Sequence, residues 1–293
     1  MSERTAQGRL PGETLLDVSA LRVEFPRRGQ PPLAAVDGAS FAVRRGTVLG
    51  VVGESGSGKS MTASAILRLV PRPGRIAAGA IRFDGQDLLA LPEAAMGGIR
   101  GRRIAMIFQN PMTSLNPAFP VSRQMTDMLR RHTGLTGEAA RARAADLLRE
   151  VGIPAVERNL DAYPHQLSGG MRQRVIIAMA LSCQPELLIA DEPTTALDVT
   201  IQAQILDILE LIANDPDRAI LFISHDFGVI ARLCDDVAVM YRGKVVESGP
   251  VDRVLAAPEH PYTRALLGAI PRPGQRGRRL MTVEDQMPAG TAP

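Results

Sequence analysis

Short, continuously apolar runs recur along the chain, separated by longer segments in which apolar residues repeat with helical spacing. A run without polar alternation is typical of a strand buried on both faces, as in the middle of a parallel sheet. The runs that fit this description are Val48–Val52, Ile104–Phe108, Leu187–Ala190, Ala219–Ile223 and Val237–Met240. We therefore predict a sheet built mainly from parallel strands.

The segments between these runs predict helices. The clearest helical patterns are Ser60–Leu69, Glu138–Val151, Arg172–Ser182 and Ile201–Ile212. Buried strands that alternate with helices fold into a mostly parallel sheet with helices on both faces. The predicted fold class is therefore α/β.

Three regions depart from this alternation. Near the start, Leu21–Phe25 and Ser40–Val43 alternate between apolar and polar residues, which predicts an N-terminal antiparallel β subdomain. Residues from about 110 to 180 contain no convincing strand, so we predict an inserted α-helical subdomain. We expect the main domain over residues 14–250, and an extension broken by prolines over residues 251–293 that ends in a loose tail, Met281–Pro293.

Composition narrows the class of protein. Of the 293 residues, 45% are hydrophobic and 22% are charged, so the chain has enough apolar residues to form a large core. Its net charge of +3 does not predict nucleic-acid binding. The densest basic run, Arg272–Arg279, is interpreted as a solvated tail rather than a binding patch. The only cysteines, Cys183 and Cys234, lack the spacing of a disulfide framework or metal site and indicate a reducing compartment.

Neither a secretory signal nor a membrane span is predicted. Met1–Gly12 is polar and has no apolar core segment. The apolar runs are far shorter than the ~20 residues that cross a bilayer. We expect a cytoplasmic location, with any membrane role exercised from outside the bilayer.

The segment after Val48–Val52 has the pattern GxxxxGK[ST] and leads into a predicted helix, which is the context that a phosphate-binding loop requires. Its glycines let backbone N–H groups converge on phosphate oxygens, and the helix N-terminus adds positive potential. Lys59 is expected to reach the β- and γ-phosphates, and the Ser60 hydroxyl to bind magnesium. A chance glycine-rich turn is the alternative interpretation. The predicted nucleotide-binding residues are Gly53, Ser55, Gly56, Ser57, Gly58, Lys59, Ser60 and Met61.

Two carboxylates, Asp191 and Glu192, follow the predicted strand Leu187–Ala190. Ligands of parallel sheets collect at the carboxyl ends of the strands. We therefore expect Asp191 to hold magnesium and Glu192 to polarise the water that attacks the γ-phosphate. Without a phosphate loop in the same chain, the pair would be interpreted equally well as a cap for the next helix.

A second segment suited to anions is Leu167–Arg174, LSGGMRQR, where a serine and two glycines open a helix. A hydroxyl, free backbone N–H groups and a helix N-terminus can together bind phosphate. One triphosphate rarely needs two such devices in one chain. We therefore expect Ser168, Gly169 and Gly170 to close on a nucleotide bound to a second subunit, in a two-fold or pseudo-two-fold dimer.

The octapeptide LSGGMRQR resembles the signature motif of ATP-binding cassette (ABC) ATPases, which are P-loop NTPases, and the other family motifs occur in the family's order. The resemblance implies that Gln109 is the Q-loop glutamine, which contacts magnesium and senses the transmembrane partner. It implies that Asp198 belongs to the D-loop and that His225 is the switch histidine that contacts the γ-phosphate and acts with the catalytic Glu192. It also implies that Phe25 stacks on the adenine.

Further features point to one branch of this family. A single phosphate loop, no long heptad stretch and no membrane span distinguish the chain from translation-type, chromosome-organising and exporter members. The segments Phe108–Pro117, Tyr163–Gln166 and Pro258–Arg264 resemble ATPase subunits of oligopeptide, dipeptide and nickel importers. The resemblance implies an ATPase that drives peptide uptake. A nickel or opine cargo, or a soluble ABC ATPase acting on nucleic acid or ribosomes, are the alternatives.

The same resemblance implies cofactors, partners and a location. ATP and Mg²⁺ are the expected cofactors. An iron–sulfur cluster, found in some relatives with longer tails, is not expected, because no cysteine follows Cys234. The expected partners are a second ABC ATPase subunit, two permease subunits and an extracytoplasmic substrate-binding protein, but no nucleic acid. The chain is expected to be peripheral, on the cytoplasmic face of the inner membrane.

Overall fold

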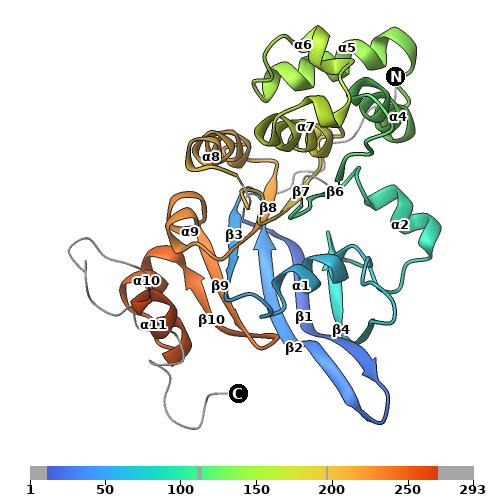
Figure 1. Cartoon of the computed structure of the whole chain (residues 1–293). Coiled ribbons are helices and arrows are strands. Elements are labelled where there is room, and N and C mark those ends of the chain that lie inside the picture. Colours follow the sequence, from blue (N-terminus) through green and yellow to red (C-terminus); the bar gives the residue numbers. More distant parts are fainter. Residues whose placement is uncertain (1–11, 111–113, 196, 270–293) are drawn as a thin grey trace.

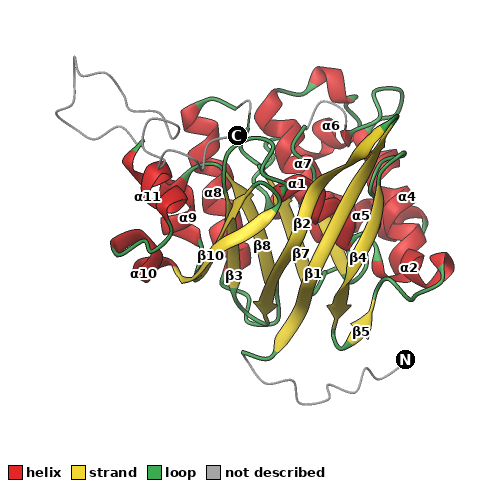
Figure 2. Cartoon of the chain, turned by 90° about the horizontal axis from the view of Figure 1, so that it is seen from below, coloured by secondary structure: helices red, strands yellow, loops and turns green. Residues whose placement is uncertain are grey.

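The computed structural model of the chain describes residues 12–110, 114–195 and 197–269, and its strands form two sheets (Figures 1 and 2). The four-stranded sheet has the order β2-β1-β4-β5, and all neighbouring strands in it are antiparallel. Its strands are β1 (Thr14–Arg27), β2 (Gln30–Arg44), β4 (Arg75–Phe83) and β5 (Gln86–Asp87). The predicted N-terminal antiparallel subdomain is confirmed.

The six-stranded sheet has the order β10-β9-β3-β8-β7-β6, and every neighbouring pair is parallel except β9 with β10 at one edge. Its strands are β3 (Val48–Val52), β6 (Ile104–Ile107), β7 (Leu187–Asp191), β8 (Ala219–Ser224), β9 (Asp236–Tyr241) and β10 (Lys244–Pro250). All residues of β3, β7 and β8 are buried, which explains their unbroken apolar sequence. The predicted mostly parallel sheet is confirmed.

Side chains of the six-stranded sheet alternate between two hydrophobic cores. On β3, Val48 and Val52 join the core formed with the larger helices, whereas Leu49 and Val51 join the core shared with the antiparallel sheet and α1. The strand therefore needs apolar residues at every position, because neither of its faces meets water.

Helices cover both faces of the six-stranded sheet, and α4 to α7 are grouped at one end of the molecule (Figure 1). The helices are α1 (Lys59–Ile66), α2 (Glu93–Ile99), α4 (Val121–Thr133), α5 (Gly137–Glu150), α6 (Val156–Leu160), α7 (Gly169–Leu181), α8 (Val199–Ala213), α9 (Phe227–Leu233), α10 (Val251–Ala256) and α11 (Pro261–Gly268), with the 3-10 turn η1 (Pro164–Gln166). In the described part of the chain no strand lies between β6 and β7. The inserted α-helical subdomain is confirmed, while its limits at about 110 and 180 stay a prediction.

The helical segment α4 shows how sequence fixes an element here. Its buried residues Val121, Met125 and Leu129 recur every fourth position and form one apolar stripe. The helix ends at Gly134, whose backbone has φ 77° and whose N–H donates to the carbonyl of Arg130. Glycine adopts this left-handed conformation without the cost that a side chain would add.

The structure extends some predicted elements and adds others. The segment Pro26–Leu33, outside the predicted strands, is the tip of the long β1–β2 hairpin, in which Arg27 pairs with Gln30. Strand β4 was not predicted.

The basic run Arg272–Arg279 and the predicted tail Met281–Pro293 lie outside the described residues. Among the helices that the structure describes, none combines the length and the apolar character needed to cross a membrane.

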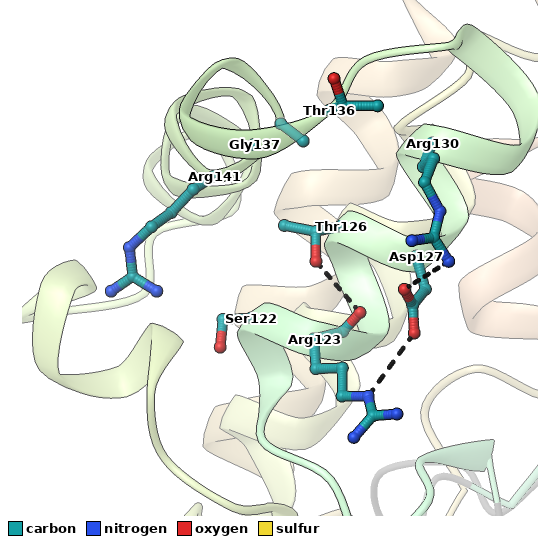
Figure 3. A pocket seen from close by; sticks show the side chains of 9 residues that line it. Ser122, Arg123, Thr126, Asp127, Arg130, Thr136, Gly137 and Arg141 are labelled. Atoms are coloured by element: carbon teal, nitrogen blue, oxygen red, sulfur yellow. Dashed lines mark hydrogen bonds and ion pairs between the residues drawn. The ribbon is translucent and has the colours of Figure 1, made fainter.

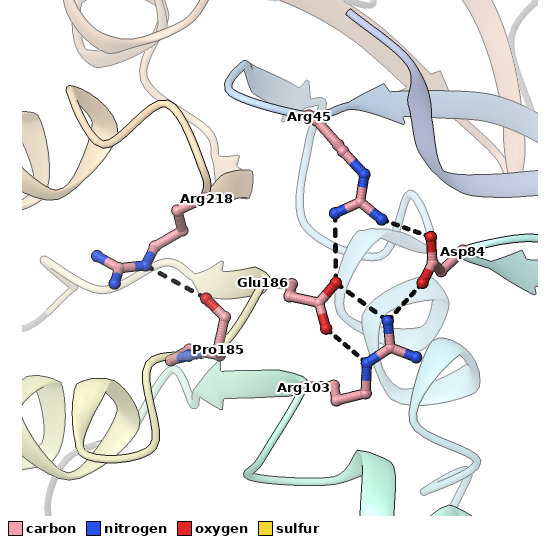
Figure 4. A network of polar contacts seen from close by, with 6 residues as sticks. All are labelled: Arg45, Asp84, Arg103, Pro185, Glu186 and Arg218. Carbon is pink, nitrogen blue, oxygen red and sulfur yellow. Dashed lines mark hydrogen bonds and ion pairs between the residues drawn. The ribbon is translucent and has the colours of Figure 1, made fainter. Parts of the chain in front are cut away.

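Four charged side chains join the two sheets (Figure 4). Arg103 Nε lies 2.5 Å from Glu186 Oε1, and its Nη2 lies 2.7 Å from Asp84 Oδ2. Arg45 Nη1 lies 3.2 Å from Glu186 Oε2 and its Nη2 lies 2.5 Å from Asp84 Oδ1. Arg103 and Glu186 directly precede β6 and β7, so this network lies at the amino ends of the parallel strands.

Candidate functional site

Three parallel strands end together at one edge of the six-stranded sheet. Val52 at the end of β3 pairs with Ser224 at the end of β8, and Asp191 at the end of β7 pairs with Ile223. The residues that follow these strands therefore meet at one place, the carboxyl edge where parallel sheets bind their ligands. They include the loop 53–58, Glu192 and His225.

The loop between β3 and α1 depends on glycine. Gly56 and Gly58 have φ of 83° and 104°, and a Cβ on Gly58 would lie 2.6 Å from the carbonyl oxygen of Ala35. The helix α1 that follows has Gly58 at its N-cap, with no side chain bonded to its first N–H groups. Backbone donors at this helix N-terminus are therefore available for an anion.

Lys59 is folded back onto its own loop. The residue is 5% exposed, and Nζ donates to the carbonyls of Gly53 at 2.7 Å and Glu54 at 2.9 Å. Burial lowers the pKa of Lys59, and the negative charges of Glu192, Asp191 and Glu54 oppose that shift. The ammonium group is thus solvated by loop carbonyls at the centre of an acidic cluster.

Ser60 and Asp191 form the second part of the site. Ser60 Oγ donates to Asp191 Oδ1 at 2.9 Å, and Asp191 is 4% exposed. Burial raises the pKa of Asp191, with a further contribution from Glu192, against the lowering effects of Ser60 and Lys59. A hydroxyl and a carboxylate side by side are hard oxygen donors, which Mg²⁺ prefers, so these residues fit the expected ion.

Glu192 is held by three neighbours. Its Oε2 accepts from Gln109 Nε2 at 2.9 Å and Thr195 Oγ1 at 2.8 Å, and Oε1 lies 3.4 Å from His225 Nδ1. Burial alone would raise the pKa of Glu192, but Thr195, His225 and Gln109 together lower it. The carboxylate is therefore ionised at neutral pH and oriented, as a general base must be.

Two residues of this group differ from the sequence-based expectation. Gln109 was predicted as a magnesium ligand, and the structure places its amide on Glu192; a role toward the metal stays a prediction. Thr195 was not among the predicted site residues, although it stands in the D-loop segment that follows the acidic pair. The threonine three residues after Glu192 is the signal that could have found it.

The predicted second anion site has a different arrangement. Ser168 is the N-cap of α7 and accepts from the backbone N–H of Met171 at 3.3 Å. A Cβ on Gly170 would lie 2.6 Å from Ile201 Cγ2, so the start of α7 packs closely on α8. Asp198 caps α8 and accepts from the N–H of Ile201 at 3.0 Å. A role of Ser168 and Gly169 toward a second subunit's nucleotide stays a prediction.

The remaining predicted residues lie in or near the cores. Phe25, on β1 opposite Leu33, is partly buried, and a Cβ on Gly74 would lie 2.7 Å from its ring. Met61 on α1 packs on the core shared with the antiparallel sheet. The role of Phe25 with adenine stays a prediction.

A polar pocket of about 410 Å³ lies away from this site, between α4 and α5 (Figure 3). Arginines contribute much of its lining, but carboxylates within the chain pair with them. Asp127 lies 3.0 Å from Arg130, and Asp161 receives two bonds from Arg141 at 2.8 and 2.7 Å. We assign no ligand to it.

Sequence models of known protein families match two parts of the chain. A sequence model of the ABC transporter family matches residues 36–195. The chain belongs to that family. A second model, described as the oligopeptide/dipeptide transporter C-terminal region, matches residues 246–293.

Similar curated proteins cover most of this chain. It is 50% identical to the oligopeptide transport ATP-binding protein OppD of Bacillus subtilis, over 92% of this chain and 75% of that protein. It is 48% identical to the dipeptide transport ATP-binding protein DppD of Escherichia coli, over 94% and 84%. It is 52% identical to the peptidoglycan transport ATP-binding protein YejF of Agrobacterium fabrum, of whose length it spans about half, 48%.

Solved structures support the same fold. The ATP-binding cassette MJ0796, solved as a dimer in a post-hydrolysis state with ADP and Pi, matches with a TM-score of 0.71 and 26% identity, over 80% of this chain and 98% of that one. The fold is that of an ABC ATPase, as predicted, and the chain is an ATP-binding ATPase subunit of an ABC transporter.

Proposed function

We propose that this chain is the ATP-hydrolysing subunit of an importer that takes up short peptides through permease subunits on other chains. The observation that carries this cargo class is the match of residues 246–293 to the oligopeptide/dipeptide transporter C-terminal region. The names of similar proteins support it: two are transport proteins for oligopeptides and dipeptides, and others import glutathione, itself a short peptide.

In this proposal the carboxyl edge binds ATP and magnesium. Lys59 exchanges its loop carbonyls for the β- and γ-phosphate oxygens, and α1 directs its first N–H groups at the same anion. Ser60 and Asp191 would hold the magnesium, with Gln109 as a further ligand; the bound ion would neutralise charge on the phosphate oxygens.

Glu192 carries the hydrolytic step. It orients the attacking water and accepts its proton at the carboxylate that Gln109 and Thr195 hold in place. His225, with a side chain 63% exposed, is free to turn from Glu192 toward the γ-phosphate when a nucleotide is present. Both catalytic roles require the substrate to enter between the ends of β3, β7 and β8.

A second ABC ATPase subunit completes the assembly that we propose. Ser168, Gly169 and Gly170 present backbone N–H groups at the N-terminus of α7 to the partner's nucleotide, while the partner's own signature residues close the site described here. The dimeric structures of the cassette MJ0796 support this arrangement. Two permease subunits and an extracytoplasmic binding protein complete an importer that holds this chain on the cytoplasmic face of the membrane.

The proposal is tested in proteoliposomes that contain the assembled transporter. We expect the peptide-loaded binding protein to stimulate ATP hydrolysis and labelled peptide to enter the vesicles. Glu192→Gln should abolish both signals, because it removes the proposed base. Stimulation by Ni²⁺ or an opine instead of peptide would replace the cargo assignment, and stimulation of the isolated chain by DNA or RNA would refute the importer itself.

A further inference from the structure

A helix from the C-terminal region contacts the phosphate loop directly. Tyr262 on α11 is fully buried, and its hydroxyl oxygen accepts the backbone N–H of Glu54 at 3.0 Å. The same hydroxyl lies 3.4 Å from Glu54 Oε2, to which it can donate. The two residues are 208 positions apart in the sequence.

Glu54 is a residue on which the loop depends. Its carbonyl accepts from Lys59 Nζ at 2.9 Å and from the N–H of Ser57 at 3.1 Å. The backbone N–H of Glu54 is therefore bonded to α11, whereas its carbonyl accepts the internal hydrogen bonds of the loop. A displacement of Glu54 would move the acceptor that positions the ammonium group of Lys59.

The Tyr262 hydroxyl is itself held in place. The Glu247 carboxylate on β10 accepts the backbone N–H groups of Glu259 at 2.7 Å and His260 at 3.0 Å, and His260 Nδ1 accepts the N–H of Tyr262 at 3.2 Å. The ring of Tyr241 at the end of β9 packs against that of Tyr262, with centroids 4.1 Å apart and the ring planes tilted by 31°. The start of α11 is thus anchored to the β9–β10 hairpin at the edge of the main sheet.

We propose that Tyr262 is a positioning residue for ATP binding, through which α11 holds the phosphate loop in its binding conformation. This inference rests on the proposed binding of ATP at that loop. The thermodynamic consequence is reciprocal: if docked α11 raises the affinity of the loop for ATP, bound ATP must stabilise the docking of α11 by the same factor.

The first test compares two variants of the full chain that each lose one hydroxyl. Tyr262→Phe keeps the ring but removes the bond to Glu54. Thr133→Val, a control on an exposed side chain, removes a hydroxyl at the end of α4 that donates to the Leu129 carbonyl at 2.6 Å and accepts the N–H of Leu135 at 3.4 Å. Affinity for ATP with Mg²⁺ is measured by titration with a fluorescent ATP analogue, and thermal stability is measured without nucleotide.

We expect Tyr262→Phe to weaken ATP affinity about threefold to tenfold, the effect of one lost hydrogen bond, while Thr133→Val leaves it unchanged. An unchanged affinity in Tyr262→Phe overturns the proposal, whatever happens to its melting temperature. Equal weakening in both variants also overturns it, because affinity would then follow general stability. Absence of ATP binding by the wild-type chain would instead refute the proposed function.

The second test measures the reciprocal effect by hydrogen exchange. In the wild-type chain, saturating ATP should slow exchange of the backbone amides of α11, Pro261–Gly268. In Tyr262→Phe this slowing should be lost, although ATP is again present at saturation. Equal ATP protection of α11 in both chains would contradict a link through the hydroxyl.

Discussion

Ser60 and Asp191 come from segments 131 residues apart and share a hydrogen bond of 2.9 Å at the carboxyl edge of the parallel sheet. The bond joins the start of α1 to the end of β7, so the phosphate loop and the acidic pair form one site. Magnesium would enter between groups that are already adjacent, with little rearrangement of the protein.

Asp191→Asn should lower magnesium-dependent ATP affinity by at least about tenfold, because it removes the only charged ligand of the Ser60–Asp191 pair. The measurement is ATP titration with Mg²⁺ and, as the control, with EDTA. We expect wild type and variant to bind equally in EDTA. A variant that keeps the full magnesium effect would exclude Asp191 as a metal ligand.

The same substitution should stabilise the nucleotide-free chain at neutral pH, by on the order of 1 kcal/mol. Burial raises the folded-state pKa of Asp191 above its ordinary value of 3.8, so the folded chain binds the proton more tightly than the unfolded chain. Wild-type stability therefore falls as pH rises through the raised pKa. Urea unfolding at a series of pH values measures the free energy of unfolding of both chains. The excess of Asp191→Asn over wild type at pH 7 should shrink toward pH 4. A difference in unfolding free energy that does not change with pH would contradict this account.

Glu192→Gln should reduce the single-turnover rate of ATP hydrolysis by a factor of about 100 or more and leave ATP affinity nearly unchanged. Thr195→Val removes one of three donors to that carboxylate and should cost about tenfold or less. The neighbours of Glu192 lower its pKa from 4.5. We therefore expect that protonation of this residue does not reduce the hydrolysis rate between about pH 6 and pH 8. Equal rates in Glu192→Gln and wild type would reject the assigned base.

Glu186→Gln should destabilise the chain by about 2 kcal/mol, because two arginines of the inter-sheet network, one of them only 7% exposed, lose one of the two carboxylates that they share and keep only Asp84. The matched control is Asp161→Asn, which breaks a two-bond pair with Arg141 whose side chains are 42% and 59% exposed. That change should stay within about 0.5 kcal/mol. Denaturant unfolding measures both, and equal losses would show that the network has no special structural role.

Local patterns predicted the centre of the fold well. The phosphate loop can be recognised from eight consecutive residues, Gly53–Ser60. The strand before it is apolar at every position because both of its faces are buried. Strand β4 gave no such signal. In RIAAGAIRF only Ile81 and Phe83 are buried, and Gly79, with φ 98°, interrupts the pattern where the strand passes Ala20.

Contacts between distant segments were beyond the reach of sequence patterns. The segment Pro258–Arg264 was recognised only by resemblance, and nothing in its order of residues indicates that the Tyr262 hydroxyl meets Glu54. Likewise, Arg45, Arg103 and Glu186 stand far apart in the sequence and come together only because strands from two sheets begin or end beside one another. Such pairings depend on the whole topology.

The bonds from Lys59 to the carbonyls of Gly53 and Glu54 mean that a phosphate group must compete with these two carbonyls for the ammonium group. A small anion that binds alone must displace these neutral acceptors, and it brings only one phosphate group and no metal. A nucleoside triphosphate offers several phosphate oxygens together with a metal ion, and so can displace the loop carbonyls from Lys59. The position of the Lys59 side chain on its own loop can therefore contribute to selectivity for ATP over free phosphate.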